Sequence, residues 1–250
     1  MSYLPAMSGI ARGIRKGRNV AEGYQRGWGL QHGGLREKIL ADPLYREAIA
    51  IAHDRTIMSE ENRMNIFLLM RFFLQALPFG HIVEYGTYRG GMAIFMAYVA
   101  KRLYPGMKVY ALDSFTGMPP TDKNIDAHDE GHFSDTDIAS LQTRIDELKL
   151  DNIVLVKGLF EDTNADVMTE AGQIALAHID CDIATAVKFV YEGVKSFMVD
   201  GGYVAFDDAT VSSCLGATEV VEDILIRRDG LNCEQIWPHF VFRIFKNQIP

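Results

Sequence analysis

The feature that most limits the fold is a regular alternation of short apolar runs and helical segments from His81 onward. Strands are predicted at the start of His81–Gly91 and at Lys108–Leu112, Asn152–Lys157, Ile174–Ile179 and Gly202–Phe206. Helices are predicted at Met92–Leu103, Thr136–Leu148, Ala184–Phe197 and Gly216–Arg228. Strands that alternate with helices form a mostly parallel sheet with helices on both of its faces.

The end of the chain adds two β-rich runs, Cys233–Trp237 and His239–Phe245, which are separated only by Pro238. They can pair antiparallel or form one bent edge of the sheet. The prediction is an α/β fold with a doubly wound, mostly parallel, seven-stranded sheet. A chain of 250 residues with 48% hydrophobic content is large enough for one domain with a full core.

The segment before this alternation divides into two parts. Residues 35–77 have helical periodicity, and Ser59 followed by Asn62 indicates a helix start. The first 34 residues contain five Lys or Arg residues but only one acidic residue, Glu22. We therefore predict an N-terminal helical arm in residues 1–55 and a main domain in residues 56–250. The arm would cover the active site or a neighbouring subunit of a homo-oligomer; a disordered tail is the alternative for its first residues.

Composition excludes several classes of protein. The formal net charge of −8 argues against a nucleic-acid binder, which needs a basic surface. The three cysteines show no C-x-x-C pairing, so neither a disulfide framework nor a thiolate zinc site is indicated, and a reducing cytoplasm is expected. The apolar stretch Ile66–Leu77 is interrupted by Arg71 and is too short to span a bilayer, so no membrane partner is expected.

The sequence HIVEYGTYRGG at His81–Gly91 predicts a strand followed by a ligand-binding loop. The spacing of Glu84, Gly86 and Gly90 differs from the G-x-G-x-x-G of pyrophosphate sites, and the carboxylate of Glu84 would repel a phosphate. A cationic ligand without phosphate, such as S-adenosylmethionine, suits this loop better than NAD or ATP. Glu84, Gly86, Thr87 and Gly90 are thus candidate cofactor residues; an ordinary strand-to-helix turn is the alternative.

Two later segments can complete a cofactor site. Asp113 ends the second strand, where a carboxylate can accept hydrogen bonds from ribose hydroxyls, and Ser114 follows it. The same pair could instead cap the next turn. Phe160 follows the third strand and could stack on an adenine ring or belong to the core.

Three aspartates follow the fourth and fifth strands: Asp180, Asp207 and Asp208. If those strands are neighbours, the carboxylates converge and repel one another without a cation. Oxygen ligands select a hard metal ion, Mg²⁺ first and Ca²⁺ or Mn²⁺ behind it. The alternative is that the aspartates cap the helices that follow them.

Four motifs together resemble the macrocin O-methyltransferase family. They are DSFTGMPP at Asp113–Pro120, GLFEDT at Gly158–Thr163, HIDCD at His178–Asp182 and GGYVAFDD at Gly201–Asp208. The resemblance implies methylation of sugar hydroxyls of antibiotics and related glycosides with S-adenosylmethionine and Mg²⁺. By position it implies that Asp180, Asp207 and Asp208 bind the metal and that Asp180 is also the general base.

Such a reaction needs a base, because a sugar hydroxyl ionises only weakly near neutral pH. A bound cation and a nearby carboxylate together make deprotonation feasible. Asp180 is the first candidate, and Asp182 and His178 are alternatives. The polar segment Asp122–Asp135, with His128 and His132, could close over the substrate or remain a solvated loop.

Two other functions use the same features. A metal-dependent methyltransferase of catechol-like or other small diols would need the same cation and a flatter, more aromatic pocket. A non-catalytic S-adenosylmethionine-binding scaffold would have no use for three clustered carboxylates. The sequence does not separate the first of these from a sugar methyltransferase.

The glycine loop generates a direct test of the ligand. We expect S-adenosylmethionine to bind and NAD not to bind, because Glu84 attracts a cation and repels a phosphate. Isothermal titration calorimetry of each ligand measures this. Heat from NAD together with none from S-adenosylmethionine would contradict the interpretation of the loop.

Overall fold

The computed structural model describes residues 34–247 of the chain. The strands are β1 His81–Tyr85, β2 Val109–Asp113, β3 Ile153–Lys157, β4 Ile174–Ile179, β5 Met198–Phe206, β6 Cys233–Gln235 and β7 Phe240–Ile244. The α-helices are α3 Leu35–Ala41, α4 Pro43–Ala52, α5 Glu60–Leu68, α6 Gly91–Leu103, α7 Ile138–Glu147, α8 Phe160–Ala171, α9 Ala184–Val194 and α10 Leu215–Val220. Two of them continue as π-helical turns, α5 through Leu69–Phe73 and α10 through Val221–Arg228.

The strands form one seven-stranded sheet in the order β3-β2-β1-β4-β5-β7-β6. The first five strands in this order are parallel, and β7 pairs antiparallel with both β5 and β6. The chain leaves β1 toward β2 on one side and returns to β4 on the other, so the winding reverses between β1 and β4. In such sheets ligands bind outside the carboxyl ends of the strands at this reversal. The predicted doubly wound α/β class is confirmed.

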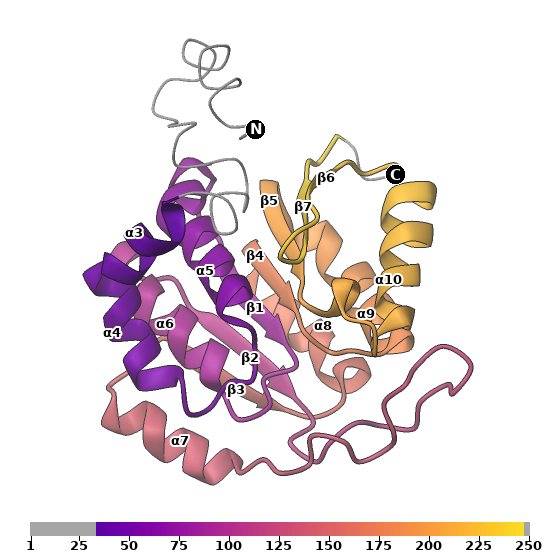
Figure 1. The fold of residues 1–250 in the computed structure, drawn as a ribbon, viewed down its shortest axis with the longest axis horizontal. Coiled ribbons are helices and arrows are strands. Elements are labelled where there is room, and N and C mark those ends of the chain that lie inside the picture. The colour runs from indigo at the N-terminus through magenta and orange to yellow at the C-terminus, as the bar shows by residue number, and fades with distance from the viewer. Residues whose placement is uncertain (1–33, 248–250) are drawn as a thin grey trace, which may run out of the picture.

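Side chains alternate between the two faces of each strand, and each face has its own core. Ile82 lies in the core shared with α3 to α7, whereas its neighbour Val83 lies in the core shared with α8 to α10. Figure 1 shows these two groups of helices on opposite sides of the sheet. Both faces are covered by apolar contacts, which explains why β1, β2 and β4 carry apolar residues on both faces and show no apolar–polar alternation.

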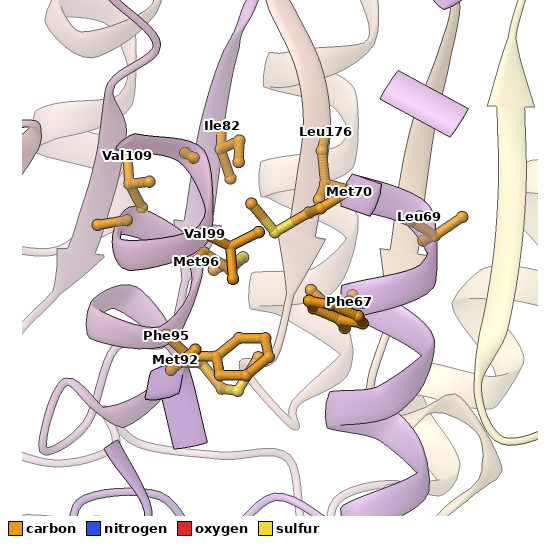
Figure 2. Close-up of a cluster of buried hydrophobic side chains, with 14 of the residues drawn as sticks. Phe67, Leu69, Met70, Ile82, Met92, Phe95, Met96, Val99, Val109 and Leu176 are labelled. Atoms are coloured by element: carbon orange, nitrogen blue, oxygen red, sulfur yellow. The ribbon is translucent and has the colours of Figure 1, made fainter. Parts of the chain in front are cut away.

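The core on the α5 and α6 side is built around aromatic rings. Phe95 of α6 is fully buried and meets Tyr45 of α4 and Phe67 of α5 edge-on, at ring-centroid distances of 5.8 and 6.4 Å. Figure 2 shows these helices placing Phe67, Met92, Phe95 and Met96 over the strands. This contact fixes α5, which carries Asn62 toward the carboxyl end of the sheet.

Two elements differ from the prediction. Helix α8 was not predicted, because its sequence FEDTNADVMTEA is rich in residues of low helix propensity and buries only a narrow stripe. Strand β5 begins at Met198 instead of Gly202. The pairing of β5 with β4 changes register between Ile174 and Leu176 of β4, and Gly201 of β5 has a φ of +76°. Gly201 and Gly202 therefore lie at an irregularity inside β5 and do not start it.

The structure describes the N-terminal arm only from residue 34 onward. From Leu35 onward, α3 and α4 bury side chains such as Leu35, Ile39 and Ala48 in the same core as α5 and α6. Residues 1–33 lie outside the described residues, and the predicted role of the arm in a homo-oligomer stays a prediction. Among residues 34–247, none of the helices has the length and apolar character needed to cross a bilayer.

The aromatic cluster generates a stability prediction. Phe95→Ala should lower the free energy of unfolding by about 3–5 kcal/mol, because it opens a cavity beneath two neighbouring rings. Phe72→Ala is the matched control, since Phe72 is 49% exposed, and it should change the free energy by no more than about 0.5 kcal/mol. Urea unfolding of both variants measures the difference. Equal losses would mean that the Phe95 ring is not a packing centre.

Candidate active site

A cavity of about 450 Å³ opens at the carboxyl edge of the sheet. Its lining comes from the segments that follow β1, β2, β3, β4 and β5 and from the segment before α5. Every residue predicted for the site except Gly90 and His178 lines this cavity, as Asp180 and Asp113 illustrate. The structure therefore brings the predicted cofactor residues and the predicted metal ligands to one chamber.

Gly86 is the point where the glycine loop meets the end of β4. Its φ is +95°, and a β-carbon at this position would overlap the carbonyl oxygen of Asp180. The backbone N–H of Asp180 also donates to the carbonyl of Tyr85, at 2.9 Å. Gly90, with a φ of +85°, starts α6 and leaves no room for a side chain beside Leu141. Both glycines are therefore required by close approach as well as by backbone conformation.

Glu84 is a buried carboxylate with only 1% exposure. Its Oε1 lies 3.4 Å from Nδ1 of His178, while Oε2 has no hydrogen-bond partner among the described residues. Burial raises the pKa of Glu84, and the contact with His178 opposes this only in part. An unpaired buried acceptor at a cavity wall is where a ligand's ammonium group would be stabilised.

Asp113 shapes two loops at once. Its Oδ2 accepts from the backbone N–H of Tyr88 and its Oδ1 from that of Phe115, both at 2.7 Å. Burial raises the pKa of Asp113, against the effect of these hydrogen bonds. A carboxylate oxygen can accept more than one hydrogen bond, and Asp113 lines the cavity. Ser114 donates to the carbonyl of Gly117 at 2.8 Å and so holds the turn that follows.

The remaining predicted cofactor residues are Thr87 and Phe160. Thr87 is buried, and its hydroxyl donates to the carbonyl of Leu112 at 3.3 Å, which ties the glycine loop to β2. Phe160 begins α8 and lines the cavity while its ring meets Tyr85 edge-on at 5.5 Å. Its position thus combines the two predicted alternatives, a core contact on one side and a cavity surface on the other.

The three aspartates converge as predicted from the strand order. Strands β4 and β5 are neighbours, and carboxylate oxygens of Asp180, Asp207 and Asp208 lie within 4.8 Å of one another. Burial and then mutual repulsion raise the pKa values of Asp180 and Asp208 well above the ordinary range. A hard cation would relieve this repulsion, and the oxygen-only donor set suits Mg²⁺.

Asp207 differs from its two neighbours because basic and amide groups surround it. Asn62 Nδ2 donates to Oδ1 at 2.7 Å, and His239 Nδ1 lies 3.4 Å from the same oxygen. Although burial opposes it, His178 and His239 lower the pKa of Asp207 below its ordinary value. Because the donors converge on Oδ1, Oδ2 stays available for a cation.

A buried hydrogen-bond network supports His239 from behind. Asn65 Nδ2 lies 2.9 Å from Nε2 of His239, and Gln235 donates to Oδ1 of Asn65 at 2.8 Å. All three residues are at least 90% buried. The network connects α5 and the β6–β7 hairpin to the aspartate cluster.

The capping alternative for the aspartates does not match the geometry. Helix α9 has Ile183 at its N-cap position with no side-chain hydrogen bond, and Asp207 makes no cap bond to the 3₁₀ turn Asp208–Thr210. The first N–H of α9, that of Ala184, instead donates to Asp126 from the loop between β2 and α7, at 3.0 Å. Asp208 accepts from the backbone N–H of Asp182 at 2.8 Å.

Asp182 lies beside two residues from other segments. Its Oδ1 is 3.5 Å from Nε2 of His128 and 3.4 Å from Sγ of Cys214. Burial raises the pKa of Asp182, and the neighbouring His128 counteracts this in part. The two histidines of this loop differ in their surroundings: His128 lines the cavity, whereas His132 is exposed.

Sequence reasoning missed the roles of Asn62, His239, Asp126 and Cys214 in this region. None of them belongs to a motif, and each is brought to the site from more than 20 positions away by the packing of the fold. The only available signal was the expected helix start at Ser59, which accepts from the N–H of Asn62 at 3.1 Å.

The strand order of the sheet and the cavity at its carboxyl edge correspond to the fold of S-adenosylmethionine-dependent methyltransferases. The calicheamicin methyltransferase CalS11 superposes with a TM-score of 0.65 at 21% identity, covering 84% of this chain and 89% of that one. The O-methyltransferase NovP superposes with a TM-score of 0.63 at 19% identity, covering 85% and 95%.

Residues 56–224 match the family described as Macrocin-O-methyltransferase (TylF), and the chain belongs to this family. The resemblance inferred from the four motifs is thereby confirmed. The chain is also 26% identical over 189 residues to the 8-demethyl-8-(2,3-dimethoxy-alpha-L-rhamnosyl)-tetracenomycin-C 4'-O-methyltransferase of Streptomyces olivaceus, covering 71% of each chain.

The opposite environments of Asp207 and Asp208 generate a prediction for the protein in EDTA. Asp208→Asn should raise the free energy of unfolding at pH 7, because it removes a repelled charge. Asp207→Asn should lower it by about 1 kcal/mol, because a charge-assisted hydrogen bond becomes a neutral one. Urea unfolding of the two isosteric variants measures both changes.

The same pair should depend on pH in a defined direction. The raised pKa of Asp208 means that its ionisation costs stability, and the lowered pKa of Asp207 means that its ionisation contributes stability. Both effects disappear as the pH falls and the carboxylates protonate, so the variants should converge on the wild type in acid. If both variants changed the free energy of unfolding in the same direction at pH 7, the environments assigned to Asp207 and Asp208 would be wrong.

Proposed function

We propose that this chain is an S-adenosylmethionine-dependent O-methyltransferase that methylates a sugar hydroxyl of a glycosylated or nucleotide-linked natural product with the help of Mg²⁺. The observation that carries the proposal is the cavity, which joins the buried carboxylate of Glu84, whose Oε2 has no partner among residues 34–247, to a cluster of three more. The acceptor class is supported by family membership and by the relative from Streptomyces olivaceus, whose name describes methylation of a rhamnosyl compound. CalS11, the structural neighbour reported above, is described as a TDP-rhamnose 3'-O-methyltransferase.

The cofactor end of the cavity suits S-adenosylmethionine. Glu84 would hold the ammonium group through its unpaired Oε2, and Asp113 would accept from the ribose hydroxyls. Phe160 would cover the adenine, since its ring lies at the cavity wall. The same carboxylates would repel the pyrophosphate of NAD.

The acceptor end is assigned to Asp180, Asp207 and Asp208 as ligands of Mg²⁺, with Ca²⁺ or Mn²⁺ as chemically similar substitutes. When bound, the cation would neutralise the cluster and make a coordinated hydroxyl more acidic. His239 and Asn62 contact Oδ1 of Asp207, which would leave its other oxygen for the cation.

A carboxylate would remove the proton of the acceptor hydroxyl. Asp180 and Asp182 both line the cavity, whereas His178 is fully buried between Glu84 and Asp207 and does not line it. A carboxylate that binds a cation is a weakened base, which favours Asp182 over Asp180. Asp208 orients Asp182 by accepting from its backbone N–H. Bound S-adenosylmethionine would supply the methyl carbon to the hydroxyl oxygen, and its sulfur would leave with the electron pair of the broken C–S bond as a neutral thioether.

A methyl-transfer assay over a panel of glycosides, nucleotide-linked sugars and catechols tests the proposal. Activity should be highest on a sugar acceptor, absent in EDTA and restored by Mg²⁺. Asp208→Asn should lower kcat/KM by at least about 100-fold, since a catalytic cation contributes several kcal/mol to the transition state. Asp151→Asn, an exposed site far from the cavity lining, is the control and should leave the rate unchanged.

Two outcomes of this assay would contradict the proposal. Full activity in EDTA would show that the aspartates have a role other than binding a catalytic cation. Transfer to catechols in preference to every sugar acceptor would assign the chain to the diol methyltransferases instead.

A further inference from the structure

A second group of metal-ligating side chains lies beside the aspartate cluster but has a different chemistry. It comprises His128 from the loop between β2 and α7, Asp182 after β4, and Cys214 immediately before α10. All three side chains line the cavity. One imidazole nitrogen, one carboxylate oxygen and one sulfur form a mixed donor set, unlike the three carboxylates next to it.

The distances between the donor atoms match the edges of a tetrahedral metal site. His128 Nε2 lies 3.5 Å from Oδ1 of Asp182 and 3.6 Å from Sγ of Cys214, and that sulfur lies 3.4 Å from the same Oδ1. Tetrahedral zinc, with bonds of about 2.0 Å to nitrogen or oxygen and about 2.3 Å to sulfur, separates its ligand atoms by about 3.3–3.6 Å.

The fold holds the three donors in place independently of any ion. Asp126, which is 3% exposed, accepts from the N–H of Ala184 and packs against Gly216, so it anchors the loop that carries His128 between α9 and α10. Thr121 donates to the carbonyl of His128 at 2.7 Å. The site would therefore be largely formed before a cation arrives.

His128 also has a partner for its second nitrogen. Its Nδ1 lies 3.3 Å from Nδ1 of His132. If Nε2 binds a metal, the ring proton is on Nδ1 and can be donated to His132. Histidine ligands of metals commonly have such a partner, which fixes the tautomer and the ring orientation.

We propose that His128, Asp182 and Cys214 form a second metal site, selective for Zn²⁺ or a similar borderline-soft cation, with its open coordination position facing the cavity. Sulfur and imidazole ligands distinguish it from the neighbouring carboxylate site, which favours hard cations. Binding replaces the proton of the Cys214 thiol by the metal and releases one proton to solvent, with no change of oxidation state. The spacing of the cysteines in the sequence carries no sign of this site.

Occupation of the site has a consequence that rests on the proposed function. A cation bound by Asp182 occupies the carboxylate that would accept the proton of the acceptor hydroxyl. Zn²⁺ should therefore inhibit methyl transfer in the presence of saturating Mg²⁺. The inhibition should be relieved by a chelator that binds Zn²⁺ much more tightly than Mg²⁺.

Cobalt(II) is the probe that tests binding without relying on activity. The full-length reduced protein, stripped of metal and supplied with excess Mg²⁺, should develop a sulfur-to-cobalt charge-transfer band and the visible bands of tetrahedral Co²⁺, both abolished by Zn²⁺. Excess Mg²⁺ occupies the carboxylate site, and that site has no sulfur ligand to produce the band. Proton release measured with an indicator dye should accompany binding.

The variants separate the site from other cysteines and from folding defects. Cys214→Ser should abolish the charge-transfer band, and His128→Gln should weaken Co²⁺ binding by at least about 10-fold, since loss of a mere supporting partner already costs this much. Cys233→Ser is the matched control, because Cys233 lies on β6 and contacts the carbonyls of Gln235 and Val241 instead. Melting curves verify that each variant folds. If Cys214→Ser does not fold, the Co²⁺ affinity of His128→Gln decides whether the second metal site exists.

Each result has one meaning. Absence of the band in the wild type, or its persistence in Cys214→Ser, would overturn the second metal site. Co²⁺ binding with no effect of Zn²⁺ on an active enzyme would overturn the role of Asp182 as the blocked base. Failure of every acceptor to be methylated in Mg²⁺ would instead contradict the proposed function and leave the cobalt result standing.

Discussion

The arrangement of the site depends on one backbone contact, the approach of Gly86 to the carbonyl of Asp180. Any side chain at Gly86 would occupy the position of that carbonyl oxygen. The contact lets the loop after β1 lie directly against the end of β4, at the reversal of the sheet. Glu84 and the aspartate cluster consequently share one chamber, where the proposed function would place a cationic cofactor beside an acceptor hydroxyl. Proximity of this kind is a large part of what an enzyme contributes to a bimolecular reaction.

That proximity concentrates negative charge, and the surrounding residues compensate for it unequally. Asp207 receives Asn62 and His239, whereas Asp180 and Asp208 have raised pKa values from burial and repulsion. His178 lies between Glu84 and Asp207, where it can compensate for both. The surrounding residues thus stabilise the charge of Asp207, whereas burial and repulsion destabilise the charges of Asp180 and Asp208. This is the condition under which a cation binds strongly.

The parts that could be predicted from sequence are those governed by local rules. Buried parallel strands are largely apolar, and polar residues at or directly after their carboxyl ends must lie at one edge of the sheet, so Glu84, Asp113 and Asp180 could be placed together. Helix α8 escaped prediction because its apolar stripe is too narrow. Asn62 and His239 escaped because tertiary packing brings them to Asp207, and no periodicity records such an approach. His128 and Cys214, the neighbours of Asp182, likewise reach it only through tertiary packing.

The hydrogen bond from the N–H of Ala184 to Asp126 ties the position of a loop to the start of helix α9. The acceptor for the first N–H of α9 comes from the loop between β2 and α7, more than fifty positions earlier in the chain, and not from the residue that precedes the helix. Displacing that loop to admit a bulky acceptor would remove the cap, which is worth about 1 kcal/mol. Displacement of the loop at Asp126 and loss of the cap on α9 would therefore be a single event, which couples the lining of the cavity to the start of α9.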